Sequence, residues 1–175
     1  MRGVDSSHER PSPGEHVLQA EDGIADQEVK DMTRVENSTS IRASTEEIGQ
    51  YIWDVNKLPS YMPISDVEVL DSREDFVKIR HKFTAAGRTM DLVCEAKWVE
   101  KNRREEYRTT EGMKLVGTWL LDPADEATRL KNIIDYEPPG GVFGKLLDRM
   151  KIRREMTRIQ AESLGKLKET LEGRK

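Results

Sequence analysis

Polar and apolar residues alternate along much of the chain between Thr33 and Tyr136, which is the period of a half-buried β-strand. The first strand is predicted over Thr33–Ile41. Six more strands are predicted over Ile64–Leu70, Phe76–Phe83, Arg88–Val99, Glu105–Thr110, Met113–Leu121 and Thr128–Tyr136. Short turns such as Ala85-Ala86-Gly87 separate them, and connections of that length join antiparallel neighbours. The pattern therefore predicts one antiparallel sheet of about seven strands.

Helical signals occur in two regions. Ser44 and Glu47 have the spacing of a capping box, which predicts a short helix through Ile52. A second short helical turn begins at Trp53 and ends at the prolines before the next strand. After Pro138-Pro139-Gly140-Gly141, a helix of about thirty residues is predicted from Val142 towards Glu172.

The long helix needs a partner for its apolar stripe, and only the concave face of the sheet is large enough. The stripe follows spacings of three and four through Phe143, Leu146, Leu147, Met150, Ala161, Leu164, Leu167 and Leu171. Arg153 and Thr157 fall in the same arc, whereas Ile152 and Ile159 lie off it and are expected to be exposed. We therefore predict an α+β fold in which a curved antiparallel sheet wraps around the long helix.

Residues 1–32 differ from the rest of the chain. They are acidic, include Pro11 and Pro13, and contain no aromatic residue. Such a segment buries too little apolar area to offset the entropy lost on ordering. We divide the chain into a disordered acidic tail over 1–32 and one domain over 33–175, with Met32 as an alternative translation start.

Composition narrows the function. The chain has 175 residues and a net charge of −4, which does not favour nucleic acid as a partner. Cys94 is the single cysteine, so no internal disulfide can form and a cytoplasmic location is expected. Two of the three histidines, His8 and His16, lie in the tail, and no phosphate-binding loop occurs. We expect no metal site and no cofactor.

Three groups of residues carry a family resemblance. They are Ser44-Thr45-Glu46-Glu47-Ile48 with Ile52-Trp53-Asp54 and Leu58-Pro59, then Gly117-Thr118-Trp119-Leu120-Leu121-Asp122-Pro123 with Ala127-Thr128-Arg129-Leu130, and finally Leu164-Gly165-Lys166-Leu167-Lys168-Glu169. From Thr33 to Leu171 the chain resembles the helix-grip fold of the START, polyketide-cyclase and pollen-allergen (SRPBCC) superfamily. It is most similar there to polyketide cyclase/dehydrase and coenzyme-Q-binding START-like proteins. The connection Pro138–Gly141 is shorter than that of many members.

The resemblance implies a cavity between sheet and helix that encloses polyketides, lipids or quinones. Alternation assigns the side chains that would face it. The candidate ligand-binding residues are His81, Phe83, Met90, Leu92, Tyr107, Leu115, Trp119, Asn132, Ile134, Tyr136, Phe143, Leu147, Met150, Arg153 and Thr157. A filled core with a few hydrogen-bonded polar residues has the same pattern, and only the resemblance favours a cavity.

Three classes of function fit this chain. The first is binding or transport of an apolar small molecule, in which Arg153 either anchors the ligand or keeps its guanidinium in solvent. The second is an enzyme of the cyclase/dehydrase type, and a buried acid and base within hydrogen-bond reach would favour it. Its candidate proton-transfer groups are His81, Tyr107, Asn132 and Arg153. The third is a co-chaperone-like protein-binding module, which a filled core would favour.

The basic first half of the long helix suggests a further partner. Its cations are Lys145, Arg149, Lys151, Arg153, Arg154 and Arg158. They could contact an anionic membrane, or they could simply form a solvated face. The sequence determines neither the ligand nor the oligomeric state.

Overall fold

The computed structural model describes residues 32–137 and 146–173. Its elements are β1 (Thr33–Ile41), α2 (Thr45–Trp53), the 3-10 helix η1 (Val55–Lys57), α3 (Leu58–Tyr61), β2 (Ile64–Arg73), β3 (Phe76–Ala85), β4 (Arg88–Glu100), β5 (Arg104–Glu111), β6 (Leu115–Ala124), β7 (Ala127–Tyr136) and α4 (Leu146–Glu172). The predicted acidic tail, apart from Met32, and the Pro138–Gly141 connection lie outside the described residues.

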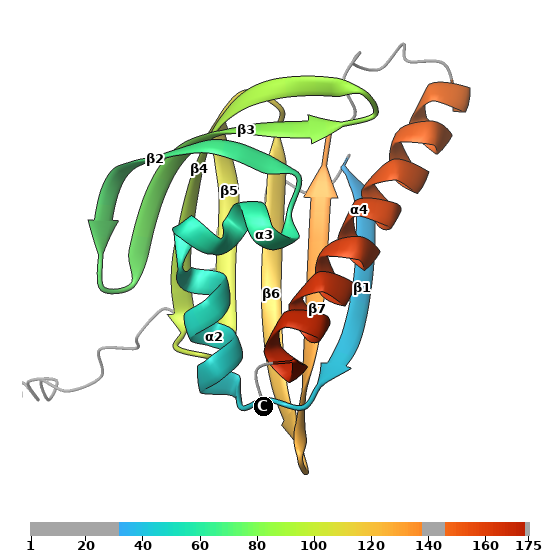
Figure 1. The fold of residues 1–175 in the computed structure, drawn as a ribbon. Coiled ribbons are helices and arrows are strands. Elements are labelled where there is room, and N and C mark those ends of the chain that lie inside the picture. Colours follow the sequence, from blue (N-terminus) through green and yellow to red (C-terminus); the bar gives the residue numbers. More distant parts are fainter. Residues whose placement is uncertain (1–31, 138–145, 174–175) are drawn as a thin grey trace, which may run out of the picture.

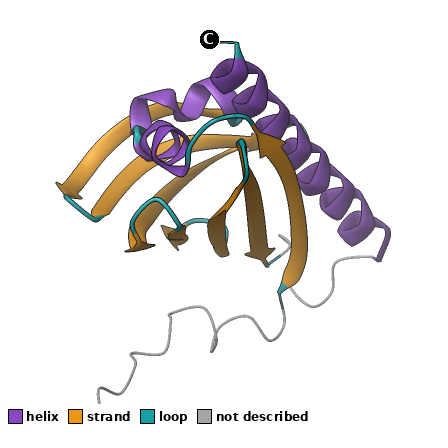
Figure 2. Ribbon diagram, turned by 90° about the horizontal axis from the view of Figure 1, so that it is seen from below, coloured by secondary structure: helices purple, strands orange, loops and turns teal. Residues whose placement is uncertain are grey.

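The seven strands form one antiparallel sheet in the order β1-β7-β6-β5-β4-β3-β2 (Figure 1). The chain order makes every pair sequential except β1 with β7, which brings the two ends of the fold together. The helices all lie on one side of the curved sheet (Figure 2). The predicted α+β helix-grip fold is confirmed.

Local chemistry explains where the elements begin and bend. The Glu47 amide donates to Ser44 Oγ at 3.2 Å and the Ser44 amide donates to Glu47 Oε2 at 2.9 Å, which is the predicted capping box at the start of α2. In β2 the pairing with β3 shifts register between Ser65 and Glu68 and again between Val69 and Asp71. Such irregularities increase the twist of an edge strand and help the sheet to curve.

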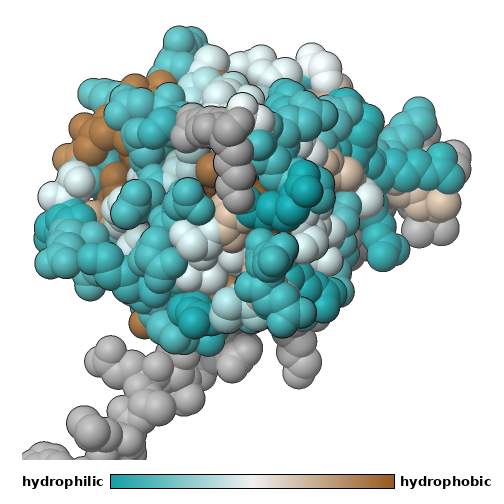
Figure 3. Space-filling model, turned by 60° about the horizontal axis from the view of Figure 1, so that its bottom comes forward, coloured by the Kyte–Doolittle hydropathy of each residue, from teal (hydrophilic) through white to brown (hydrophobic). Residues whose placement is uncertain are grey.

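Two apolar clusters pack between the helices and the sheet. One joins α2 and the C-terminal half of α4 to β6 and β7, with Ile48, Leu130 and Leu167 fully buried. The other joins the first half of α4 to β3, β4 and β7, around Phe83, Leu92 and Ile134. The face in Figure 3 is mostly hydrophilic, as expected for the outer surface. No helix among the described residues is long and apolar enough to cross a bilayer.

The predicted stripe of α4 is right only at the three leucines of its C-terminal turns. Leu164, Leu167 and Leu171 are buried, but Met150 is 48% exposed, and Arg153, Thr157 and Ala161 also face solvent. In their place the first half buries Met156 and Ile159, the second of which was expected to be exposed.

The obliquity of α4 explains this error. The helix crosses the twisted sheet diagonally, so successive turns present different faces to it (Figure 1). The rotation moves the guanidinium of Arg153 into solvent, where its charge keeps its hydration. The prediction assumed that one side of the helix is buried from Leu146 to Leu171, whereas the buried side changes along α4.

Candidate functional site

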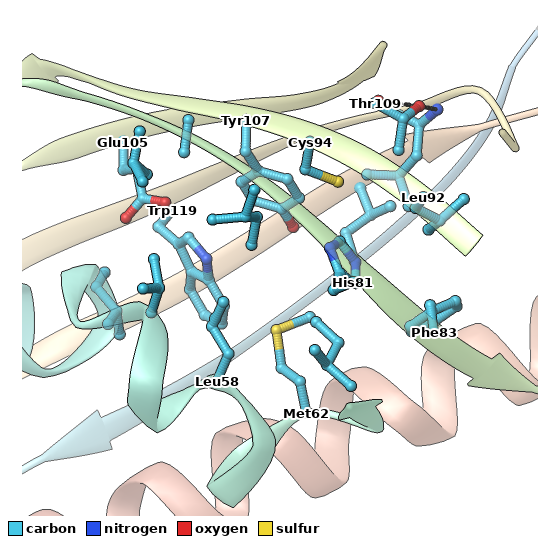
Figure 4. A pocket seen from close by; sticks show the side chains of 18 of the residues that line it. Leu58, Met62, His81, Phe83, Leu92, Cys94, Glu105, Tyr107, Thr109 and Trp119 are labelled. Carbon is cyan, nitrogen blue, oxygen red and sulfur yellow. Dashed lines mark hydrogen bonds between the residues drawn. The ribbon is translucent and has the colours of Figure 1, made fainter. Parts of the chain in front are cut away.

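A cavity of about 100 Å³ lies between the concave face of the sheet and the three helices. Its sheet wall comes mainly from β3, β4, β5 and β6, with one residue each from β2 and β7, and its opposite wall comes from α2, η1, α3 and α4 (Figure 4). Inward-facing residues are brought side by side by the strand register, which pairs Ile79 with Cys94 and Cys94 with Thr109. Most of the lining is apolar, so the space suits an apolar ligand.

Seven of the predicted ligand-binding residues line this cavity: His81, Phe83, Leu92, Tyr107, Leu115, Trp119 and Ile134. Asn132 and Tyr136 are buried but do not line it, and Met90 is only half-buried beside it. Met150, Arg153 and Thr157 lie on the solvent side of α4, so their predicted inward orientation is wrong. Phe143 and the side chain of Leu147 fall outside the part of the structure that is described.

Several lining residues are absent from the predicted ligand-binding set. One group comes from the short helices and their ends, and includes Ile52, Trp53, Leu58 and Met62. Nothing in strand alternation locates these residues, because they reach the cavity only through the folding of α2 and α3 over the sheet. From α4 the cavity receives Met156 and Ile159, which the straight stripe had excluded.

Glu105 is a carboxylic acid in the cavity lining that the predicted ligand-binding set does not include. Alternation along β5 places it on the same face as Tyr107 and Thr109, so its inward position was available from the pattern. Charged residues are normally assigned to the solvent face, and that convention hid it. In the structure Glu105 lines the cavity at the end where Trp119 lies (Figure 4).

Tyr107 reaches the centre of the site because β6 carries a glycine opposite it. Gly117 pairs with Tyr107, and a Cβ atom at that glycine would lie 2.0 Å from Cζ of the tyrosine ring. The ring therefore crosses β6 and brings its hydroxyl to β7, where Asn132 Nδ2 donates to it at 3.0 Å. Asn132 thus supports the cavity wall without lining it.

The direction of this hydrogen-bond network is settled by two backbone carbonyls, which can only accept. Gln160 Nε2 on α4 donates to the Asn132 carbonyl at 2.8 Å and to Asn132 Oδ1 at 3.0 Å. Asn132 Nδ2 then donates to the Thr118 carbonyl at 3.3 Å as well as to Tyr107. Because the Tyr107 oxygen accepts from Asn132, its own hydrogen is free to be donated towards the cavity.

The hydroxyl of Thr109, by contrast, already has hydrogen-bond partners in the backbone. It donates to the Met113 carbonyl at 2.7 Å and accepts from the Leu115 amide at 2.9 Å. Cys94 is also inert, since burial raises the pKa of its thiol to about 12 and keeps it protonated. Neither side chain offers a reactive or unpaired group to a ligand.

Two titratable groups in the lining have a buried atom without a hydrogen-bond partner, His81 Nδ1 and Glu105 Oε2. Burial lowers the pKa of the His81 imidazole, which favours its neutral form at pH 7. Burial raises the pKa of the Glu105 carboxyl to about 8, so this group is mostly protonated at pH 7 in the empty cavity. Within the described residues no hydrogen bond joins His81, Glu105 and Tyr107 to one another. A search of the same residues finds no cluster of three or more metal-ligating side chains.

Comparisons with known proteins agree with the fold. A family model described as polyketide cyclase / dehydrase and lipid transport matches residues 32–172. A solved structure of a Thermus thermophilus protein is 25% identical, with a TM-score of 0.69 over 79% of this chain and 97% of that one. An aromatase/cyclase from a Streptomyces species is 19% identical, with a TM-score of 0.71 over 82% of this chain and 95% of that one.

A START superfamily protein from Mycobacterium smegmatis is 19% identical, with a TM-score of 0.60 over 81% of this chain and 95% of that one. The last two likenesses support the fold alone, because their sequence identities are low. A comparison with curated protein sequences finds no match.

Proposed function

Since the chain belongs to the polyketide cyclase / dehydrase and lipid transport family, we propose that it binds an apolar small molecule in the cavity between the sheet and α4. We further propose that the ligand carries an oxygen that accepts a hydrogen bond from Tyr107. The observation that carries this proposal is that the oxygen of Tyr107, a residue of the mostly apolar lining, accepts a hydrogen bond from Asn132, which leaves the hydroxyl hydrogen for a ligand.

The cavity is smaller than most ligand sites, which occupy roughly 300–1,000 Å³. It measures about 100 Å³ between the side chains as they stand. Leu58 and Met62 form part of its helical wall, and both are only half-buried (Figure 4). Movement of these two side chains would admit a longer ligand, and the unbranched Met62 is the more adaptable of the two.

Two experiments test the proposal. Gentle purification followed by mass spectrometry of the organic extract should recover a small apolar molecule in stoichiometric amount. Titration with 2-octanone should change the emission of Trp53 and Trp119, which line the cavity. Tyr107→Phe should weaken 2-octanone binding about tenfold, as expected for one lost hydrogen bond.

Tyr136→Phe is the matched control. It also removes a buried tyrosine hydroxyl, but that hydroxyl has no partner and Tyr136 does not line the cavity. Its affinity for the ketone should equal that of the wild type. Equal affinities for the wild type and Tyr107→Phe would contradict the role of Tyr107, and no binding at all would contradict the proposal as a whole.

The other two classes of function are less well supported. A cyclase/dehydrase-type enzyme would need groups that move protons together, and His81, Glu105 and Tyr107 share no hydrogen bond. A protein-binding module needs no cavity, whereas this domain has one. A cytoplasmic location stays a prediction that rests on the single cysteine.

A further inference from the structure

We propose that Glu105 is the counter-ion for a positively charged amine on the ligand, so that the cavity takes apolar amines and rejects apolar carboxylates. The inference rests on the proposed function, because it concerns the same cavity and names a second polar contact there. Tyr107 would bind an oxygen of the ligand and Glu105 its ammonium group.

Glu105 is a buried acid without a partner. It is 6% exposed, lies on β5 between Trp98 on β4 and Trp119 on β6 in the strand register, and has no hydrogen bond to Oε2. A buried polar atom in this state is costly and calls for an explanation. Because Glu105 lines the cavity, a group on a bound ligand is the partner that its position supports.

The neighbouring acid shows the contrast. Glu106 is almost equally buried, at 7% exposed, but it points to the other face of β5 and pairs with Arg104. The chain thus supplies a cation to the outer carboxylate and none to the inner one. The difference indicates that the inner position is reserved for a cation that the protein does not itself provide.

Among the residues that the structure describes, no lysine or arginine lines the cavity. Its other titratable groups are Tyr61 on α3, His81 on β3, Cys94 on β4 and Tyr107 on β5. Burial raises the pKa of Tyr61, Cys94 and Tyr107 and lowers that of His81, so all four are predominantly neutral at pH 7. An ammonium group would therefore meet no competing cation, whereas a ligand carboxylate would be buried without a counter-charge.

Aromatic rings surround the same space. Trp53, Tyr61, Tyr107 and Trp119 all line the cavity, and the Trp119 indole lies next to the Glu105 carboxyl in Figure 4. The faces of such rings attract cations, most strongly where water is excluded. The rings and the carboxyl together favour an ammonium group over a neutral donor.

Binding would be coupled to proton release. In the empty cavity Glu105 is mostly protonated at pH 7, since its pKa is about 8. An amine arrives as the ammonium ion, the carboxyl gives its proton to the buffer, and the carboxylate then pairs with the ammonium. Affinity should therefore rise about tenfold from pH 6 to pH 7 and level off above pH 8.

The test uses three probes of equal length: octylamine, 1-octanol and octanoate. Calorimetry in two buffers of different ionisation enthalpy measures both the affinity and the number of protons released. For the wild type at pH 7.5 we expect octylamine to bind at least tenfold more tightly than 1-octanol, with most of one proton released, and octanoate not to bind. Glu105→Gln should remove the preference for the amine and the proton release while it retains octanol binding.

Glu106→Gln is the matched control, because it neutralises the adjacent glutamate on the outer face and should keep the preference for the amine. Equal binding of octylamine and octanol to the wild type, or a preference that survives in Glu105→Gln, would overturn the inference and leave the cavity as a binding site for neutral ligands. If octylamine, octanol and 2-octanone all fail to bind, the proposed function fails as well. Proton release and its pH dependence are measured on the wild type, so the test does not depend on the folding of a variant.

Discussion

Tyr107 and Gly117 face each other across β5 and β6, and the tyrosine ring occupies the space that any other residue at position 117 would fill. The nearest ring atom would be 2.0 Å from a Cβ at that position, and the hydroxyl oxygen would be 2.3 Å away. Because position 117 is a glycine, the Tyr107 ring can lie over β6 and its hydroxyl can reach Asn132. This hydroxyl is the polar group that we propose binds the ligand.

Gly117→Ala should therefore displace the Tyr107 ring. We expect a loss of about 1–3 kcal/mol in the free energy of unfolding, as is usual for overpacking, and a fall in 2-octanone affinity to the level of Tyr107→Phe. Urea denaturation and the fluorescence titration measure the two effects. Gly165→Ala is the control, because Gly165 lies in α4 with open space around it, and it should add about 0.5–1 kcal/mol. Wild-type stability and affinity in Gly117→Ala would contradict the contact.

Glu105→Gln should change how stability depends on pH. Burial raises the pKa of Glu105 from 4.5 to about 8, so the folded chain holds this proton to higher pH than the unfolded chain does. Stability contributed by the protonated form is complete below about pH 4.5 and is lost as the pH rises through 8. At about 1.4 kcal/mol for each pH unit, the wild type should lose about 3–5 kcal/mol over this range relative to Glu105→Gln. Parallel pH curves for the two proteins would contradict the burial of an unpaired acid.

Gln160→Met should weaken the network behind the cavity. The substitution keeps the length of the side chain but removes the donor to the carbonyl and Oδ1 of Asn132. We expect a loss of about 1–3 kcal/mol, together with weaker ketone binding as Asn132 loses its fixed orientation. Gln50→Met, at an exposed position on α2, should change stability by no more than about 0.5 kcal/mol. Equal effects of the two substitutions would show that the network contributes little.

A chain that begins at Met32 should retain the fold. The family match begins at residue 32, and the composition of residues 1–31 predicts a solvated segment. Its melting temperature should lie within a few degrees of that of the full chain, measured by circular dichroism. A large decrease would show that the tail packs on the domain.

Contact with an anionic membrane stays a prediction of the basic helix. Lys151, Arg153 and Arg154 are exposed on α4 close to the exposed Met150. Sedimentation with phosphatidylserine vesicles should show binding that Gln substitutions of these three cations abolish, since each contributes about 1 kcal/mol near an anionic surface. Binding should also vanish at high salt. Equal sedimentation with neutral vesicles would contradict an electrostatic contact.

Much of the site is a consequence of local pattern. Strict alternation in β3 placed His81 and Phe83 on the cavity side, and the same period in β5 placed Tyr107 there. Alternation is reliable in these strands because a shift of one residue would move a whole row of side chains to the opposite face. The same alternation also predicts that Glu105 faces the cavity. Glu105 was left out of the predicted set only because an acid is seldom assigned to an inner face.

The sequence by itself determined the order of the elements, the antiparallel sheet and the inner face of each central strand, because these depend on period-two spacing, turn length and capping. Tertiary structure alone decided which face each turn of α4 buries, that α2 and α3 complete the cavity, and that a Tyr107 ring passes over Gly117 to meet Asn132. These features depend on how one element crosses another in space. Because the sheet is twisted, the side of a straight helix that contacts it changes from turn to turn. The spacing of apolar residues within one segment does not show this change.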